Sequence, residues 1–313
     1  MTTAGAETAD RMAAAFASIA DGTGTAADVR ASLKATRKPA KPVPVGKVGD
    51  GRIDGPEGMK SIPVRIYRPL DAPEGLLPVV VYFHGGGFVL CDLDSHDSCC
   101  RRLCNGIGAV VVSVDYRLAP EHPFPAAVDD AWAAVQWVSM NAVDIGVDPD
   151  RLVVAGDSAG GNLAAVVSML ARDHGGPAIA FQLLIYPVVD QRRKSSATSE
   201  YSTSGSALSS DHTRWFTQQY LGAGGDRDDV LASPILGDFA GLPPAHIVTG
   251  EKDPLRAEEE QYAELLRAAG VPVTIAKYDN MFHGFFNLAD HLPIARQAND
   301  DVCEILNGAL TCN

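Results

Sequence analysis

The sequence predicts an α/β fold in which a mostly parallel sheet of about eight strands is flanked by helices. Two observations favour it. From Leu77 onward, apolar strand-like segments alternate with helical ones, which is typical of crossover units in a sheet covered on both faces. One apolar segment also runs directly into a helical one through a glycine-rich turn at 156–161. A chain of 313 residues, 46% of them hydrophobic, is long enough for one large domain or two smaller ones, and we expect a single domain spanning 1–313.

Helical patterns open the chain. Residues 10–19 are amphipathic, and 26–35 can form a second helix that ends before the proline-rich segment at Lys38. Residues 51–69 then alternate between apolar and polar side chains. This alternation predicts antiparallel edge strands joined by a turn at Asp54-Gly55-Pro56.

The remaining elements follow the α/β alternation. Strands are expected at 78–83, 109–115, 151–156, 179–186, 245–249 and 272–278, with helices at 96–106, 126–141, 159–173, 256–269 and 292–309. The interval 187–242 interrupts this rhythm and holds a helical piece at 209–221. A connection of that length inside a compact domain is typically a lid or cap.

Composition excludes several classes of function. A formal net charge of −13 argues against nucleic acid or an anionic membrane as a partner, since both need clustered cations. No apolar run approaches the roughly 18 residues of a membrane span, and the N-terminus lacks a signal-peptide pattern, so a cytoplasmic location is expected. The six cysteines form no C-x-x-C pair, so we expect neither zinc nor disulfides.

The turn at 156–161 has the pattern of a nucleophile. Gly156 and Gly160 flank Ser158, with an apolar strand before them and an alanine-rich helix after. Such a strand-to-helix turn projects the serine hydroxyl above the sheet edge. The amide of Ala159, at the helix start, then points to where an oxyanion would form. The motif alone also fits a turn of small residues, so it needs a base, an acid and further donors.

His283 is the expected base. It follows the last strand in Asp279-Asn-Met-Phe-His-Gly-Phe-Phe, and in a parallel sheet that loop opens at the same edge as the Ser158 turn. Gly284 lets the backbone bend so that the imidazole projects inward. Core or surface positions are the better interpretation for His174, His212, His246 and His291.

Asp253 is the expected acid, because it follows the strand at 245–249, again at a carboxyl end. An acid is needed to fix the tautomer of the catalytic histidine. Asp253 before Pro254 also suits a helix cap, and Glu251 is a neighbouring competitor. The shorter carboxylate is the usual orienting group.

The third element of the site follows strand 78–83, in Tyr82-Phe-His-Gly-Gly-Gly-Phe. Gly85, Gly86 and Gly87 expose backbone amides that an anionic oxygen can approach. A phosphate-binding loop is excluded, because no Gly-Lys-[Ser/Thr] follows and the G-x-G-x-x-G spacing is absent. His84 is better suited to bracing this loop than to acting as a base.

Motifs spread between about residues 45 and 300 resemble those of the bacterial hormone-sensitive-lipase-type esterases, family IV of the α/β-hydrolase fold. The matching segments, in order, are His84-Gly-Gly-Gly, Tyr116-Arg-Leu-Ala-Pro-Glu-His-Pro-Phe-Pro-Ala, Gly156-Asp-Ser-Ala-Gly-Gly, Asp253-Pro-Leu-Arg and His283-Gly-Phe. The order of serine, acid and histidine along the chain is also the order of this fold.

The resemblance implies a catalytic triad of Ser158, Asp253 and His283, with oxyanion donors from Gly85, Gly86, Gly87 and Ala159. It also implies a helical cap built from the N-terminal arm, residues 1–45, together with residues 190–225. The segment Gly156-Asp-Ser-Ala-Gly is similar to one of the two main subgroups of the family, in which pairing through the last strand, here 272–278, is a common route to homodimers.

Two further features bear on the pocket. The segment from Tyr116 to Ala126 carries Arg117, Glu121 and His122 among prolines, and we expect it to lock the loop beside the oxyanion turn. Cys91 stands where many relatives have glycine, which places a thiol near the acyl pocket together with Phe88.

One departure from the family pattern lies beside the acid. Ala257 replaces an acidic residue often found after Asp-Pro-Leu-Arg, while Glu258 to Glu260 keep the helix start acidic. The triad assignment is therefore unaffected.

The expected function is that of a serine carboxylesterase for short- to medium-chain acyl esters, with a small-molecule ester as its partner and neither a cofactor nor a metal. An amidase or peptidase with the same triad stays open, because both chemistries share the tetrahedral intermediate. The rival from another class is a ligand-binding pseudo-enzyme. Such proteins lose a triad member, whereas Ser158, Asp253 and His283 are all present here.

Overall fold

The computed structural model describes residues 14, 24–37, 41–56, 61–193 and 208–311. The expected helix at 10–19 lies outside the described residues except for Ala14, as do parts of the predicted cap at 1–45 and 190–225. None of the described helices is long and apolar enough to cross a membrane.

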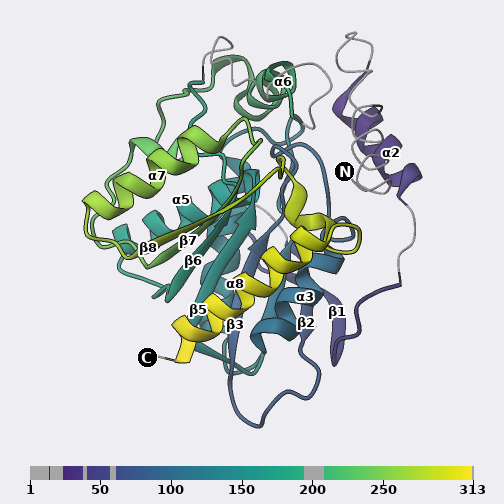
Figure 1. Ribbon diagram of the computed structural model, residues 1–313, viewed down its shortest axis with the longest axis vertical. Coiled ribbons are helices and arrows are strands. Elements are labelled where there is room, and N and C mark those ends of the chain that lie inside the picture. Colours follow the sequence, from purple (N-terminus) through teal and green to yellow (C-terminus); the bar gives the residue numbers. More distant parts are fainter. Residues whose placement is uncertain (1–13, 15–23, 38–40, 57–60, 194–207, 312–313) are drawn as a thin grey trace.

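An eight-stranded sheet forms the centre of the molecule, in the order β1-β2-β4-β3-β5-β6-β7-β8 (Figure 1). Strands β1 (Lys47–Ile53) and β2 (Ile62–Arg68) are antiparallel to each other, and β2 is antiparallel to β4. All the other neighbours pair in parallel. The remaining strands are β3 (Leu77–Phe83), β4 (Val110–Val114), β5 (Val147–Asp157), β6 (Phe181–Ile185), β7 (Ala245–Gly250) and β8 (Val273–Tyr278). The predicted α/β fold with a mostly parallel sheet of eight strands is confirmed.

The expectation that 51–69 supplies only edge strands is wrong for β2. That strand lies inside the sheet, where Val64 pairs with Val114 of β4, and its residues Ile62 and Tyr67 are fully buried. Strand β5 also begins earlier than expected, at Val147, because that residue pairs with Leu77 across a shift in register.

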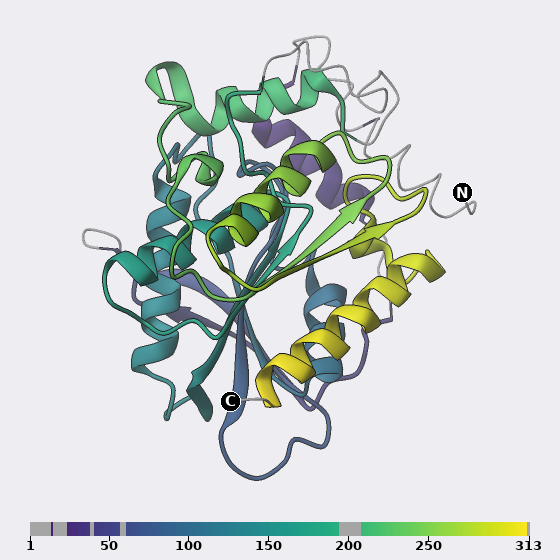
Figure 2. The same cartoon turned by 60° about the vertical axis from the view of Figure 1, so that its left-hand side comes forward.

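Helices cover both faces of the sheet (Figures 1 and 2). Because side chains alternate along a strand, Val81 of β3 joins the core on one face while Tyr82 joins the core on the other. The first face carries α4 (Ala126–Met140), α5 (Ala159–Asp173) and α7 (Arg256–Ala268). The second carries α3 (Asp97–Ile107) and α8 (Pro293–Thr311). These helices match the predicted ranges to within a few residues.

Two further helices, α2 (Ala26–Thr36) and α6 (Ser210–Leu221), lie together at the upper end of the molecule (Figure 2). Helix α2 starts with a capping box in which Thr25 and Asp28 satisfy each other's backbone amides. Its buried residues Ala26 and Val29 join a small apolar cluster against which Phe216 of α6 packs. Short 3₁₀ segments follow at Gly222–Gly224, Pro234–Leu236 and Phe285–Leu288, the last labelled η3 below.

Candidate active site

The turn between β5 and α5 holds Ser158 in a strained backbone conformation, with φ of 55° and ψ of −115°. A non-glycine residue adopts a positive φ only when its surroundings enforce it. The enforcing contacts are close, since a Cβ atom on Gly160 would lie 1.9 Å from the carbonyl oxygen of Phe83, and one on Gly156 would lie 2.3 Å from Gly160. The two glycines therefore let β3, β5 and α5 meet tightly, and Ser158 stands at the corner.

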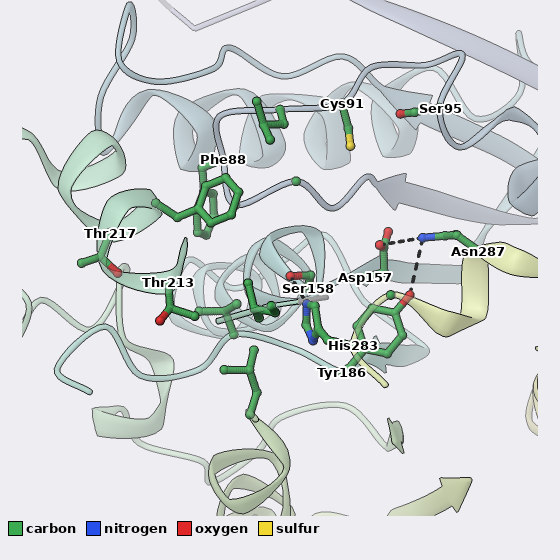
Figure 3. A pocket seen from close by; sticks show the side chains of 18 of the residues that line it. Phe88, Cys91, Ser95, Asp157, Ser158, Tyr186, Thr213, Thr217, His283 and Asn287 are labelled. Atoms are coloured by element: carbon green, nitrogen blue, oxygen red, sulfur yellow. Dashed lines mark hydrogen bonds between the residues drawn. The ribbon is translucent and has the colours of Figure 1, made fainter. Parts of the chain in front are cut away.

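The structure brings the three predicted triad residues into hydrogen-bond contact. His283 Nε2 lies 2.8 Å from Ser158 Oγ (Figure 3). His283 Nδ1 lies 2.7 Å from Asp253 Oδ2. The Asp253 side chain is buried, and its other oxygen accepts the amide of Leu255 at 2.8 Å. With both oxygens engaged, Asp253 fixes His283 in the tautomer that presents an unprotonated Nε2 to the serine.

The sequence also allows Asp253 to be the N-cap of α7, and the structure shows that this alternative is wrong. The N-cap position is Leu255, and α7 has no side-chain cap. The carboxylate instead orders the turn before the helix through the Leu255 amide while it holds His283.

The loop that carries His283 is shaped by Gly284, whose φ of 89° is available to glycine at little cost. Tyr186, just beyond β6, places its ring 4.8 Å from the imidazole, measured between centroids. Figure 3 shows the Tyr186 ring beside His283 on the floor of the pocket. Sequence reasoning missed Tyr186, because no local motif marks a tyrosine that meets the base only through the sheet order.

The glycine loop after β3 departs from the predicted oxyanion hole at one residue, Gly85. The amide of Gly85 donates to Asp157 Oδ1 at 3.0 Å, so it is not available as an oxyanion donor. Among the described residues, the amides of Gly86 and Gly87 in this loop, and that of Ala159 at the start of α5, donate to no backbone acceptor. Gly86 and Gly87 have φ of 111° and 63°, conformations that suit glycine.

A buried carboxylate, Asp157, ties this loop to the nucleophile turn. Besides the Gly85 amide it accepts the Tyr82 hydroxyl and the Asn287 amide, both at 2.8 Å, and His96 Nε2 lies 3.1 Å away. Burial opposes its ionisation, but the charge of His96 and the hydrogen bonds from His96 and Tyr82 hold the pKa of Asp157 below its usual value. Sequence reasoning missed this role, for which the only signal was an acid beside the serine in a buried turn.

His84 braces the loop, in line with its expected role. It is fully buried and stacks on Tyr116 at 4.4 Å between ring centroids, while the Tyr116 hydroxyl donates to the carbonyl of His84 at 2.6 Å. Burial lowers the pKa of His84 to about 4, so its imidazole is neutral at pH 7.

The segment at 116–126 holds the neighbouring loops, also as expected. Arg117 forms a bidentate pair with Asp130 of α4, whose side chain is completely buried. The amide of Ala119 donates to the carbonyl of Phe88 at 2.9 Å. The Glu121 carboxylate accepts a hydrogen bond of 2.7 Å from the Arg30 guanidinium of α2, and this contact connects the segment to the helix above the site.

A cavity of about 310 Å³ opens above Ser158 and is lined largely by apolar side chains (Figure 3). Both predicted pocket residues, Phe88 and Cys91, line it. Phe88 stacks on Tyr220 at 3.7 Å. Burial raises the pKa of the Cys91 thiol to about 12, so it lines the pocket as a neutral group. Further lining residues come from α2 and from the region of α6, namely Leu33, Leu208, Thr213, Phe216 and Thr217.

One group of described side chains has the spacing of a metal site: Asp253, Glu259 and His283 offer ligand atoms within 4.8 Å of one another. Two of these residues already bond to each other, since His283 Nδ1 and Asp253 Oδ2 are 2.7 Å apart. A metal ion held by those two atoms would have to displace that hydrogen bond. The absence of a metal requirement stays a prediction.

Comparisons with known proteins agree with this geometry. A family model described as the alpha/beta hydrolase fold matches residues 80–287, more than half of the chain. The carboxylesterase NlhH of Mycobacterium tuberculosis is 44% identical over 295 residues, covering 91% of each chain.

Solved structures agree as well. The esterase of Pyrobaculum calidifontis gives a TM-score of 0.81 at 46% identity, covering 85% of this chain and 86% of its own. An ester hydrolase from the metagenome of Lake Arreo, in complex with a derivative of bipyridine phosphonate, gives a TM-score of 0.87 at 40% identity, covering 96% and 97%. The chain therefore belongs to the α/β hydrolase fold family.

Proposed function

We propose that Ser158, His283 and Asp253 carry out carboxylic ester hydrolysis in this chain. The main support is the chain of two hydrogen bonds from Ser158 Oγ through His283 to Asp253, which are 2.8 and 2.7 Å long. The similar proteins named above are a carboxylesterase, an esterase and an ester hydrolase, which supports the same activity. The chain is thus a serine carboxylic ester hydrolase.

The geometry gives each group a step. His283 Nε2 takes the proton of Ser158 as Oγ bonds to the acyl carbon, and the carbonyl π electrons move onto its oxygen. The amides of Gly86, Gly87 and Ala159 donate to that oxyanion. His283 then returns the proton to the leaving alkoxide, and the acyl–oxygen bond breaks. A water molecule deprotonated by His283 repeats the sequence, which releases the acid and restores Ser158.

Short to medium acyl chains fit the site. The cavity of about 310 Å³ is at the small end of ligand pockets, and its lining is largely apolar. Phe88, stacked on Tyr220, and Leu33 of α2 bound the space open to the acyl or alcohol group. The side chains that line the cavity, and not the triad itself, determine which esters the chain accepts.

The cap, too, is part of the proposal. Residues of α2 and α6 line the cavity above Ser158, and this supports a cap contributed by 1–45 and 190–225 on a single domain. Strand β8 is the last strand of the sheet, and among the described strands its outer edge has no partner, which supports a homodimer formed through 272–278. Membership of the Gly-Asp-Ser-Ala-Gly subgroup and a cytoplasmic location stay predictions.

Replacement of the nucleophile tests the proposal. Ser158→Ala should lower kcat for a p-nitrophenyl acyl ester by roughly six orders of magnitude, because it removes the oxygen that forms the acyl-enzyme. A fluorophosphonate should label the unmodified chain at Ser158 and leave the variant unlabelled. The mechanism is wrong if the variant keeps even about a tenth of the original turnover. Matched ester and amide substrates separate the esterase from the amidase alternative, which the similar proteins do not favour.

A further inference from the structure

Helix α7 carries a fully buried carboxyl group, Glu259, beside the triad. Its side chain is 0% exposed, and among the described residues neither carboxyl oxygen makes a hydrogen bond of good geometry, although the Thr249 hydroxyl is close enough to act on it as a donor. Ligand atoms of Glu259, Asp253 and His283 all lie within 4.8 Å of one another. A glutamate is almost never fully buried without a partner, so the position calls for a physical explanation.

The surroundings of Glu259 contain no free cation among the described residues that act on it. The carboxylates of Asp253, Glu258 and Glu260 face it with negative charge, and the Thr249 hydroxyl and the His283 ring complete the group. The nearby guanidinium of Arg193 is already engaged, since its Nη1 lies 2.6 Å from Glu258 Oε1. Glu259 therefore has no counter-charge of its own.

Two carboxylates this close in a buried site cannot both stay ionised, so one must carry the proton. Asp253 accepts the Leu255 amide and the His283 ring nitrogen, contacts that stabilise its charge. Glu259 has only the Thr249 hydroxyl to favour its charge, and burial together with the charge of Asp253 outweighs it and raises the pKa of Glu259 well above its usual value. The proton therefore belongs on Glu259.

We propose that Glu259 is a positioning residue of the triad, whose neutral carboxyl group offers an O–H donor to the Asp253 carboxylate and leaves a single negative charge beside His283. This inference rests on the proposed function of Ser158, His283 and Asp253. No covalent bond is made or broken by Glu259, and its proton stays in place through the reaction. Its role is to hold Asp253, which in turn holds the imidazole.

The arrangement has a consequence for the reaction. An ionised Glu259 would add a second negative charge near His283, and a negative charge favours the imidazolium over the neutral imidazole that must accept the Ser158 proton. A neutral Glu259 avoids this and still fills the space behind Asp253. A role in filling space and a role in donating a hydrogen bond can be told apart, because glutamine donates and methionine does not.

Two substitutions of similar size make the test, with kcat and KM for a p-nitrophenyl acyl ester measured from pH 5 to 10. Glu259→Met removes the donor and should lower kcat by about tenfold at unchanged KM, which is typical of losing an outer hydrogen-bond partner. Glu259→Gln keeps a neutral donor and should restore kcat to within about twofold of the original, with the acid limb of its pH profile at an unchanged midpoint.

Three outcomes would overturn the proposal. Full activity in Glu259→Met would show that the side chain only fills space. An equal loss in Glu259→Gln and Glu259→Met would show that the charge is needed. An acid limb displaced downward by more than about half a pH unit in Glu259→Gln would show that Glu259 is ionised in the original chain. Fluorophosphonate labelling of Ser158 in the unmodified chain reports on the proposed function separately, because it does not depend on Glu259.

Discussion

Asp157 is the residue on which most elements of the site converge. Its carboxylate collects donors from β3 through Tyr82, from the glycine loop through Gly85, from the start of α3 through His96 and from η3 through Asn287. Hydrogen bonds to a buried charge are stronger than neutral ones, and each donor left without its partner carries a desolvation cost. One carboxylate thus holds the oxyanion loop against the nucleophile turn.

Asp157→Asn should damage both stability and turnover. The amide has one acceptor oxygen instead of two, and its NH₂ group faces donors, so the free energy of unfolding should fall by about 3 kcal/mol. Release of Gly85 should let the oxyanion loop move and lower kcat by about tenfold or more. Urea unfolding and p-nitrophenyl ester kinetics measure the two effects.

Tyr82→Phe is the matched control, because it removes a single donor to the Asp157 carboxylate and should lower the free energy of unfolding by about 2 kcal/mol, less than Asp157→Asn. Unchanged kcat in Asp157→Asn would mean that the loop keeps its shape without the carboxylate.

The two kinds of residue in the site differ in how far sequence predicts them. Ser158, Asp253 and His283 are marked locally, by glycines and by their places at strand ends. The hydrogen bond from the Gly85 amide to Asp157 cannot be predicted from the local sequence. It depends on the parallel register that sets Phe83 of β3 beside Gly156 of β5. Glu259 looks like one more acid at a helix start until the packing of α7 buries it beside Asp253.

At the scale of elements, α2 matters more than its length suggests. A helix of 11 residues is marginal by itself, so its place above the site depends on packing. Val29 supplies that packing in the cluster with Val89 and Leu90, while Arg30 and Arg37 add ion pairs to Glu121 and Asp92. These pairs are partly exposed and contribute little alone, so the apolar contact is the main anchor.

Val29→Asp should therefore release α2 from the pocket. A buried, unpaired carboxylate is costly, and separating the helix from its cluster avoids that cost. Loss of Leu33 from the pocket wall should raise KM roughly fivefold, equivalent to about 1 kcal/mol of substrate contact, with little change in kcat. Steady-state kinetics with p-nitrophenyl butyrate and hydrogen exchange over 26–36 provide the measurements.

Ala27→Asp places the same charge on the exposed face of the same helix and should leave KM unchanged. If the two variants behave alike, the helix is not held by its apolar face.

Sequence periodicity predicts where helices and strands lie along the chain better than it predicts which strands pair with each other in the sheet. The helices and parallel strands fall within a few residues of their expected positions, because their patterns are local. The insertion of β2 between β1 and β4 was not predicted, since the position of a strand in a sheet is fixed by pairing with a segment far along the chain. The sequence likewise shows no reason for β5 to begin at Val147 until its pairing with Leu77 is known.

At the scale of the whole molecule, the sheet ends in β8, which is secured to the rest through β7. A side-chain contact reinforces this pairing, with His246 Nδ1 lying 2.7 Å from the Thr274 hydroxyl at directly paired positions. His246 is 2% exposed, and its Nε2 meets no donor or acceptor among the described residues. Burial lowers the pKa of His246 to about 4.

This histidine should make the last strand pair a source of acid sensitivity. The unfolded chain binds a proton at His246 below pH of about 6.5, whereas the folded chain binds it only near 4, so stability is complete above 6.5 and falls as pH drops between these values. By pH 4 the loss attributable to His246 should reach about 3 kcal/mol. His246→Gln tests this, because glutamine cannot ionise. Between pH 7 and 4, the free energy of unfolding measured in urea should fall by about 3 kcal/mol less in His246→Gln than in the original chain. Thr274→Val, which removes the hydrogen-bond partner and keeps the histidine, should retain the steep acid dependence. Parallel curves for the original chain and His246→Gln would mean that the imidazole is already solvated in the fold.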